Sequence, residues 1–399
     1  MGNTEYMGSM ENMGKRKQWM NQCRIRKNNQ WNKERRKRKW QGPGAGSDYG
    51  KTDGRKIHGA CRKTRTGKSA GMKPEVTVVI PNYEGITYIG ACLDSLYAGS
   101  MIPEVIVVDN GSGDGSAELL AKLTSKRGKY PSCRLVRFRE NRGFPAAVNT
   151  GIRLAKTRYV ILLNNDTEVD RDFVKNLYHA IRRRKNAFSV SAKVLSLRQP
   201  ETIDDAGDLY CSLGWAFALG KGKKRTAYRK DAEIFASCAC AAVYRKCVFE
   251  TIGYFDENHF AYLEDIDVGY RARISGYRNY YSPDALAYHA GSAVSGSRYN
   301  DFKVRLSSRN SIYLIYKNMP SLQILLNLPF LAAGIGIKAL FFLKKGLGKA
   351  YAEGLLEGFR LSLSEEGKRQ KVRYRQECFW NYVKIQLELW QNTIRRITG

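Results

Sequence analysis

From residue 76 onward, short apolar runs alternate with amphipathic stretches. Four runs of five or six residues, at 76–80, 104–109, 133–138 and 158–163, are rich in Val, Ile, Leu or Tyr, as buried strands are. Three stretches between them, 88–99, 116–126 and 145–156, carry apolar residues at helical spacing. Strands that alternate with helices predict a mainly parallel sheet with right-handed crossovers and helices on its faces. The pattern therefore predicts an α/β fold.

Polar residues follow the predicted strands at Asn82, Asp109, Arg142 and Asp166. Because the carboxyl ends of parallel strands meet at one edge of a sheet, we expect these residues to line a single ligand-binding edge. The fourth strand ends in the run Asn164 to Glu168 without a Gly or Pro turn. Oxygen ligands of this kind suit a hard cation such as Mg²⁺, although a strand-end Asp is more often a turn or cap residue.

A second polar turn contains Asp109, Asn110, Ser112 and Asp114, separated by glycines that let a ligand approach the backbone. Its side chains are able to hydrogen-bond a nucleoside. On its own the turn is a weak signal, since Asp, Asn, Ser and Gly dominate ordinary turns.

The sequence YLEDIDVGYR concentrates acidic residues at Glu264, Asp265 and Asp267. One interpretation is the N-terminus of a surface helix, where acidic residues suit the helix dipole. The other is a general base, with a pKa set by the acidic neighbours and by Arg271 and Arg273. His289, between an apolar strand and a small-residue loop, is a candidate ligand beside the more common packed histidine.

The formal net charge of +31 comes from 68 Lys and Arg against 37 Asp and Glu, and residues 1–71 alone hold 19 basic and five acidic residues. We expect this segment to be disordered, and Met72, just before the first strand, is a possible true start. Its basic patch would suit nucleic acid or an acidic membrane. The nine cysteines include no CxxC pair, which indicates buried reduced thiols and a cytoplasmic setting rather than zinc or disulfides.

Residues 319–343 form an apolar run of 25 residues that contains a single charge, Lys338, and a proline, Pro329. Three arrangements remain open for this run: a buried helical hairpin, a single membrane span, and helices that lie at the membrane interface. Basic residues after the run would attract anionic lipid. We therefore divide the chain into 1–71, a catalytic domain at 72–318 and a helical membrane-associating region at 319–399.

Seven blocks between about residue 75 and residue 318 resemble the inverting family-two glycosyltransferases with the GT-A fold, in their rhamnosyltransferase-like branch. The blocks are VTVVIPNYEG, VIVVDNGSGDGS, ENRGFPAAVNTGI, YVILLNNDTEV, GYFDENHFAYLEDIDVGYRARISGYR, PDALAYHAGSAVSG and SRNSIYLIYKN.

The resemblance implies a role for each matching residue. Asp265 matches the catalytic base, while Asp166 and His289 match ligands of a Mg²⁺ or Mn²⁺ ion on the donor diphosphate. Asn164 departs from the family's Asp-x-Asp motif, so we expect Asp166 to carry most of the metal binding. Glu264, Asp267 and Arg271 are expected to support the base or the acceptor. The expected donor-binding residues are Pro81, Asn82, Tyr83, Glu84, Asp109, Asn110, Arg142, Gly143, Asn149 and Asn165.

The resemblance implies that Asp265 deprotonates an acceptor hydroxyl, which displaces a nucleoside diphosphate from the anomeric carbon with inversion. The first candidate donor is dTDP-rhamnose, with UDP-sugars open, and the acceptor would be a glycan or lipid-linked glycan of a cell-surface polysaccharide. We expect a cytoplasmic protein at the inner face of the cell membrane, without a nucleic-acid partner. The alternatives are a nucleic-acid-binding protein that uses the basic tail, a nucleotidyltransferase on a similar sheet, and an inactive nucleotide binder.

Overall fold

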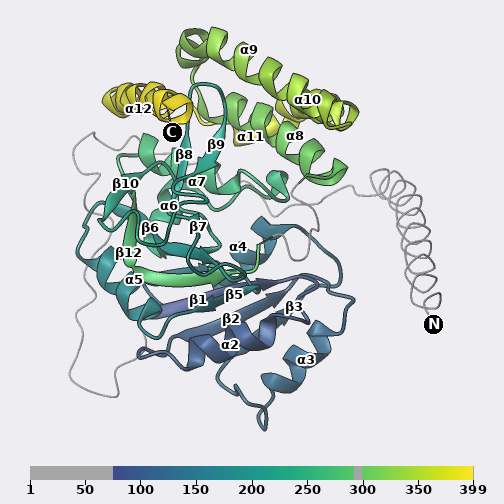
Figure 1. Ribbon diagram of the computed structural model, residues 1–399, viewed down its shortest axis with the longest axis vertical. Coiled ribbons are helices and arrows are strands. Elements are labelled where there is room, and N and C mark those ends of the chain that lie inside the picture. Colours follow the sequence, from purple (N-terminus) through teal and green to yellow (C-terminus); the bar gives the residue numbers. More distant parts are fainter. Residues whose placement is uncertain (1–74, 292–298, 399) are drawn as a thin grey trace, which may run out of the picture. The chain divides into compact units, whose positions relative to one another are not determined.

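The computed structural model describes residues 75–291 and 299–398 (Figure 1). The segment 1–71 and the possible start at Met72 lie outside the described residues, so the expectations for them stay predictions.

One part of the main sheet is parallel and follows the predicted strands. Its strands are β1 (Val76–Asn82), β2 (Glu104–Asp109), β3 (Arg134–Arg137) and β4 (Tyr159–Leu163), in the spatial order β4-β1-β2-β3. β1 pairs in parallel with β2 and β4, and Asn82 lies opposite Asp109. The register thus places polar residues from different strands side by side at the carboxyl edge.

The rest of the sheet is mixed and extends it in the order β10-β12-β6-β11-β4. β11 runs antiparallel to both β4 and β6, whereas β12 runs parallel to β6. The strands here are β5 (Thr167–Val169), β6 (Ala187–Ser196), β7 (Ile203–Asp205), β10 (Ala232–Ile234), β11 (Ala241–Arg245) and β12 (Arg278–His289). β8 (Asp208–Tyr210) and β9 (Ala216–Ala218) form a separate antiparallel pair. The predicted α/β class is confirmed.

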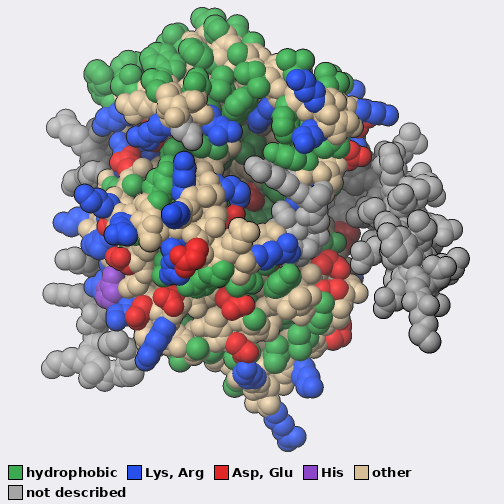
Figure 2. Space-filling view, in the orientation of Figure 1, with side chains coloured by type: hydrophobic (Ala, Val, Ile, Leu, Met, Phe, Trp, Pro, Cys, Tyr) green, Lys and Arg blue, Asp and Glu red, His purple; other side chains and the backbone are tan. Residues whose placement is uncertain are grey.

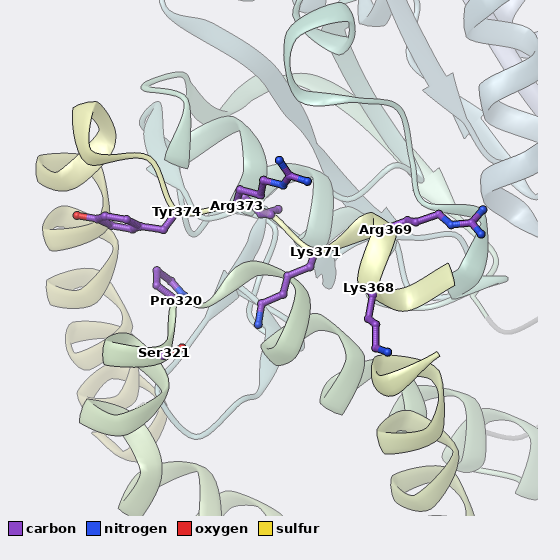
Figure 3. A pocket seen from close by; sticks show the side chains of 8 residues that line it. Pro320, Ser321, Lys368, Arg369, Lys371, Arg373 and Tyr374 are labelled. Carbon is purple, nitrogen blue, oxygen red and sulfur yellow. The ribbon is translucent and has the colours of Figure 1, made fainter. Parts of the chain in front are cut away.

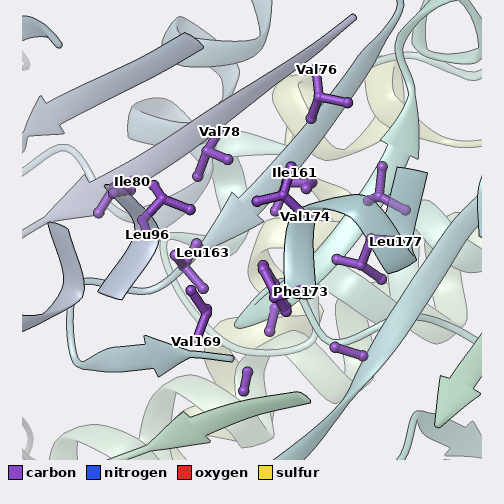
Figure 4. Packing of buried hydrophobic residues seen from close by; sticks show 14 of the residues in the cluster. Val76, Val78, Ile80, Leu96, Ile161, Leu163, Val169, Phe173, Val174 and Leu177 are labelled. Atoms are coloured by element: carbon purple, nitrogen blue, oxygen red, sulfur yellow. The ribbon is translucent and has the colours of Figure 1, made fainter. Parts of the chain in front are cut away.

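Helices cover both faces of the sheet. One face carries α2 (Ile89–Tyr97), α3 (Ser116–Leu123) and α5 (Phe173–Arg182), and the other carries α4 (Phe144–Leu154), α6 (Lys246–Ile252) and α7 (Glu264–Ile274). Successive residues of β1 alternate between the two cores, because strand side chains point to opposite faces. Figure 4 shows Val78 and Ile80 packed in the first core with residues of α2 and α5. Each fully buried side chain of this size contributes about 1.5–3 kcal/mol of hydrophobic free energy.

Helices follow β12 to the end of the described chain. They are α8 (Asp301–Asn318), α9 (Ser321–Lys344), α10 (Gly348–Leu363), α11 (Glu365–Gln370) and α12 (Phe379–Thr398). A short 3₁₀ turn precedes α7 at Glu257–His259, and another precedes α12 at Gln376–Cys378. α10 packs closely on α8, since a Cβ at Gly354 would overlap the carbonyl of Arg305. By length and composition α9 could cross a membrane, with a mean hydropathy of 1.9, but only 17% of its most apolar window is buried. The buried helical hairpin considered for this run is therefore wrong.

Candidate active site

The first group of predicted site residues forms one buried hydrogen-bond network at the carboxyl edge of β1, β2 and β4. The Asn82 amide Nδ2 donates to Asp109 Oδ1 at 2.8 Å, and Asn82 Oδ1 accepts from Asn165 Nδ2 at 2.8 Å. Ser112 Oγ also donates to Asp109 Oδ1, at 2.6 Å. Residues that are far apart in the sequence thus meet at the predicted edge.

The loop on either side of Asn82 is partly exposed and is held by the second polar turn. Pro81, Tyr83 and Glu84 are all half-buried. Glu84 Oε1 accepts a hydrogen bond from the Gly113 N–H at 2.8 Å, and its φ of 52° lies in the left-handed region, which is uncommon for a residue other than glycine. These three side chains therefore border the network from the solvent side.

The Asn110 side chain fixes the loop that precedes α4. Its Oδ1 accepts from the Arg142 N–H at 2.9 Å, and its Nδ2 donates to the Gly143 carbonyl at 3.1 Å. Gly143 has a φ of 87°, and a Cβ there would lie 2.6 Å from the Phe260 carbonyl, so only glycine fits this approach. The Arg142 guanidinium lies over the Phe138 ring, 5.0 Å from its centroid, and remains half-exposed.

Asn149 differs from the other predicted donor-binding residues. It is 1% exposed, and its amide exchanges two hydrogen bonds with the Phe255 backbone, at 2.8 and 3.0 Å. Its Nδ2 also donates to Glu257 Oε1 at 3.2 Å. Both ends of the amide thus fasten α4 to the loop after α6, and the donor-binding role of Asn149 stays a prediction.

Asp166 and His289 come together from β-strand ends that are 123 positions apart in the sequence. His289 Nε2 lies 3.3 Å from Asp166 Oδ1, and His289 Nδ1 lies 2.9 Å from Asp204 Oδ2. Burial alone would lower the pKa of His289, but the Cys240 thiol, Asp166 and Asp204 together raise it well above its usual value. The imidazole thus lies between two carboxylates, one beside each ring nitrogen.

This geometry fits a divalent cation. When Nδ1 donates its proton to Asp204, Nε2 directs its lone pair toward Asp166, and a carboxylate behind the distal nitrogen is a common arrangement for histidine ligands. One carboxylate and one imidazole leave positions for diphosphate oxygens and water, as Mg²⁺ and Mn²⁺ require. Asp204 was not among the predicted residues. Its only signal in the sequence was a pair of acids, Asp204 and Asp205, in an otherwise irregular region.

Glu264 and Asp265 open α7, which is buried along almost its whole length, so the surface-helix interpretation is wrong. The chain enters this helix through strained backbone, since Phe260, Tyr262 and Leu263 all have left-handed φ values, of 60°, 71° and 68°. Such strain persists only where the surrounding structure holds it, and it clusters at functional sites.

The carboxyl groups of Glu264 and Asp265 are poised to take up a proton. Among the described residues, neither Glu264 Oε2 nor Asp265 Oδ1 has a hydrogen-bond partner. Burial, with Asp208 and Asp267 nearby, raises the pKa of Glu264 to about 7. Burial, together with Glu264 and Asp208, also raises the pKa of Asp265 well above its usual range, although the Ala239 N–H opposes this shift.

Asp267 and Arg271 form a structural support beneath Asp265. Burial acts to raise the pKa of Asp267, but Arg271, Lys317 and His259 together outweigh it and lower this pKa. Arg271 donates to Asp267 at 2.7 and 3.0 Å and to backbone carbonyls at 252–254. Arg273 instead pairs with Glu233 and Glu388. Neither arginine therefore tunes Asp265 as the sequence suggested; the neighbouring carboxylates do.

α8 holds the strained loop in front of the base. The Asn310 amide nitrogen donates to the carbonyls of His259, Ala261 and Tyr262, at 2.9, 2.8 and 2.7 Å. Arg309 adds hydrogen bonds to the carbonyls of Asn258 and His259. At the end of α8, Lys317 and Asn318 bind Asp267 at 3.0 and 2.9 Å. The block SRNSIYLIYKN, which carried part of the family resemblance, thus holds α7 and the loop before it in place.

Two acids and a thiol that the sequence did not single out lie near both the Asp166–His289 pair and the Glu264–Asp265 pair. The ligand atoms of Asp205, Asp208 and Cys238 all lie within 4.8 Å of one another. Burial raises the pKa of Asp208 to about 7, and no ion pair to Asp205 or Asp208 occurs within 75–291 and 299–398. The turn 238–240 joins the clusters, because Cys240 interacts with His289 and the Ala239 N–H with Asp265. Seven described cysteines are free thiols, as expected.

Three comparisons bear on this arrangement. Residues 77–253 match the profile of "Glycosyl transferase family 2". The chain is 27% identical over 243 residues to poly-beta-1,6-N-acetyl-D-glucosamine synthase of Staphylococcus aureus (strain COL), covering 55% of this chain and 53% of the relative. It is 29% identical over 210 residues to the low-salt glycan biosynthesis hexosyltransferase Agl10 of Haloferax volcanii, covering 51% of this chain and 62% of the relative. The chain thus spans about half to three-fifths of the length of these curated relatives.

A solved structure of GalNAc-T7 with UDP, GalNAc and Mn²⁺ shares the fold, with a TM-score of 0.50 at 13% identity, covering 62% of this chain and 48% of that one. The relatives are not specifically rhamnosyltransferases, so the rhamnose branch is not supported by them. Residues 77–253 thus match glycosyl transferase family 2, and the fold is GT-A-like.

Proposed function

We propose that this protein is a metal-dependent, inverting glycosyltransferase that moves a sugar from a nucleotide donor to a hydroxyl group of a glycan or lipid-linked glycan. The observation that supports the proposal is the turn at 238–240, whose Cys240 interacts with His289 and Asp166 and whose Ala239 N–H interacts with Asp265 beside Glu264. A diphosphate bound at Asp166 and His289 and an acceptor hydroxyl bound at Glu264 and Asp265 would enclose the sugar between them.

In this proposal each cluster has one task. Asp166 and His289 hold a Mg²⁺ or Mn²⁺ ion, which when bound stabilises the negative charge of the leaving diphosphate. The network of Asn82 and Asp109 binds the nucleoside. Asp265 takes the proton from the acceptor hydroxyl, so that the oxygen attacks the anomeric carbon from the face opposite the leaving group. We assign Asp205 and Asp208, which interact electrostatically with Asp265, to the hydroxyl groups of the bound sugar.

The test is a panel of nucleotide sugars, each with Mg²⁺, with Mn²⁺ and with EDTA, in which the released nucleoside diphosphate is measured. dTDP-rhamnose stays our first donor, and UDP-N-acetylglucosamine joins it because of the name of the staphylococcal relative. Release of a diphosphate with one donor and one metal would support the proposal. Release of pyrophosphate from a nucleoside triphosphate would favour a nucleotidyltransferase instead.

We keep the division into a catalytic domain at 72–318 and a helical region at 319–399 as part of the proposal. We also propose that the protein works at the inner face of the cell membrane in the synthesis of a surface polysaccharide. The apolar, exposed helix α9 supports a membrane location.

Glu264→Gln should shift the pH dependence of transfer. A nearby carboxylate raises the pKa of Asp265, so removing its charge lowers that pKa, and the base stays deprotonated at lower pH. We expect the acidic limb of the kcat/KM profile to move to lower pH. Glu118→Gln, on the exposed surface of α3, is the control and should leave the profile in place. A limb that moves to higher pH would refute this relation between the two acids.

Asn310→Ala should slow transfer without weakening donor binding. The substitution removes the side-chain donor of the Ala261 and Tyr262 carbonyls and one of the donors of the His259 carbonyl, and each polar group left without a partner in such a site costs about 1–3 kcal/mol. We expect kcat to fall by about tenfold or more while the donor Kd stays constant. Asn176→Ala on α5, which removes an exposed hydrogen bond to the Asp284 carbonyl, is the matched control. Equal losses in the two variants would show that Asn310 has no special role.

A further inference from the structure

We propose that α9 does not cross the membrane but lies flat in one leaflet, with parts of α10 and α12 beside it, as a docking face for anionic lipid. This deepens the proposed membrane location and does not depend on which sugar is transferred.

One stripe of α9 is attached to the rest of the protein from end to end. The buried residues of α9 are Gln323, Asn327, Leu331, Gly334 and Phe342. Their spacing of three, four or eight residues keeps them on one face of the helix. Both ends and the middle of α9 are therefore in contact with the protein, and no half of the helix is free to enter a bilayer alone.

The Gln323 amide oxygen and the Asn327 amide of this stripe have hydrogen-bond partners on other elements. Gln323 Oε1 accepts a hydrogen bond from the Tyr270 hydroxyl of α7 at 2.6 Å. Asn327 exchanges two hydrogen bonds with Gln386 of α12, at 2.8 and 2.9 Å. A spanning α9 would have to bring these amides into hydrocarbon without their partners, which the bilayer penalises strongly. The matched pairs therefore favour a docked helix.

The middle of α9 packs closely against the segment that contains Leu213 and Trp215. A Cβ at Gly334 would overlap the Leu213 carbonyl, and Trp215 Nε1 donates to the Gly334 carbonyl at 3.1 Å. The single charge of the apolar run, Lys338, lies over the Trp215 ring, 5.5 Å from its centroid. Gly334 and Lys338 thus face the protein, while Pro329 lies among the exposed apolar residues of α9.

That opposite side is exposed and continuous with neighbouring helices. Leu325 and Leu340 are 66% and 63% exposed, and further large apolar side chains of α9 share their exposure. α10 and α12 add exposed apolar residues, namely Leu356, Phe359, Leu363, Trp380, Leu387, Ile394 and Ile397. Figure 2 shows the region of these helices covered by apolar side chains, with Lys and Arg gathered directly beneath them. An apolar face with a basic border matches the interface of an anionic leaflet.

The charge of this region identifies lipid as the occupant. Residues 319–399 hold 13 Lys and Arg against six Glu, and most of these cations are exposed. At the first turn of α9, a hollow of about 520 Å³ is lined by Pro320, Ser321, Lys368, Arg369, Lys371 and Arg373, among others. Figure 3 shows Lys368 and Lys371 extending to the same side of this hollow, where phosphate groups of lipids would be attracted.

The first experiment measures binding of the full chain to vesicles of phosphatidylglycerol or of phosphatidylcholine by flotation. Leu325→Glu with Leu340→Glu should reduce binding to phosphatidylglycerol vesicles by about tenfold or more. Ile102→Glu changes an apolar residue of similar exposure, 57%, in the loop before β2, and should bind like the wild type. Unchanged release of nucleoside diphosphate in detergent-free solution would show that the double variant is folded. Wild-type binding by a folded double variant would overturn the proposal.

The second experiment separates a flat helix from a span. Cysteines are introduced one at a time at Ser321 and Lys345, exposed positions at the two ends of α9, and isolated inverted membrane vesicles are treated with a membrane-impermeant maleimide. A flat helix predicts that both positions react from the side that carries the catalytic domain, above the background of the native cysteines. Reaction of one end only after permeabilisation would show a span and overturn the proposal. Loss of self-association in the double variant, with lipid binding unchanged, would assign the face to a second copy instead.

Discussion

Asp265→Asn is expected to abolish sugar transfer, with kcat lowered by about 10²–10⁴-fold, the usual contribution of a general base. The asparagine amide has the shape of the carboxyl group but cannot take a proton. Asp265 Oδ1, which has no partner elsewhere in the described chain, would be replaced by a group of similar size. The donor Kd should change by less than about twofold, because the base does not hold the nucleotide. Single-turnover kinetics and calorimetric titration of the donor measure the two quantities.

The matched control for this substitution is Asp284→Asn. Asp284 is an exposed residue of β12, away from both clusters, and its side chain takes no part in the site. Transfer at the wild-type rate by Asp265→Asn, with Asp284→Asn also active, would mean that the base lies elsewhere. Glu264 would then be the next candidate.

Asp166→Asn is expected to remove most of the metal dependence of the enzyme. The amide cannot supply the negative charge that a divalent cation seeks, and His289 alone is a poor site for Mg²⁺. We expect the Mn²⁺ concentration for half-maximal activity to rise by about 100-fold or more, since even outer-shell partners of metal ligands contribute 10–100-fold. The activity is titrated with Mn²⁺ at saturating donor.

Asp204→Asn should weaken metal binding to a smaller degree. It keeps a hydrogen bond to His289 Nδ1 but removes the charge behind the imidazole, and we expect a loss of about 10–100-fold in metal affinity. Asp172→Asn, an exposed acid before α5, serves as the control. If Asp204→Asn lowers the metal affinity more than Asp166→Asn does, the assignment of Asp166 as a ligand is contradicted.

The parallel part of the fold was predictable because its signals are local. Strands of five or six apolar residues and helices with apolar residues three and four apart are defined within a few positions of the chain. The polar residues after those strands were also predictable as a group, since a parallel sheet must bring its carboxyl ends together. Asn82, Asp109 and Asn165 meet there as expected.

The rest of the site depends on contacts that no local pattern encodes. Asp204, Asp205 and Asp208 fall in a region of three-residue strands, where the order of pairing is set by the tertiary structure. The family resemblance placed Asn149 among the donor-binding residues, and no local pattern shows that its amide is hydrogen-bonded to the backbone of Phe255. The burial of α7 was equally hidden, because its charged residues find partners on α8.

α8 has a consequence for the choice of acceptor. The same helix grips the loop before Asp265 through Asn310, and it runs into α9 after only two residues, Met319 and Pro320. With the docking face in a leaflet, no flexible linker separates the base from the lipid surface, so the base stands at a fixed height above the headgroups. α8 would then fix the distance between the base and the lipid surface. A lipid-linked glycan would be extended only when its terminal hydroxyl reaches that height, which would set the number of sugars already present on the acceptor.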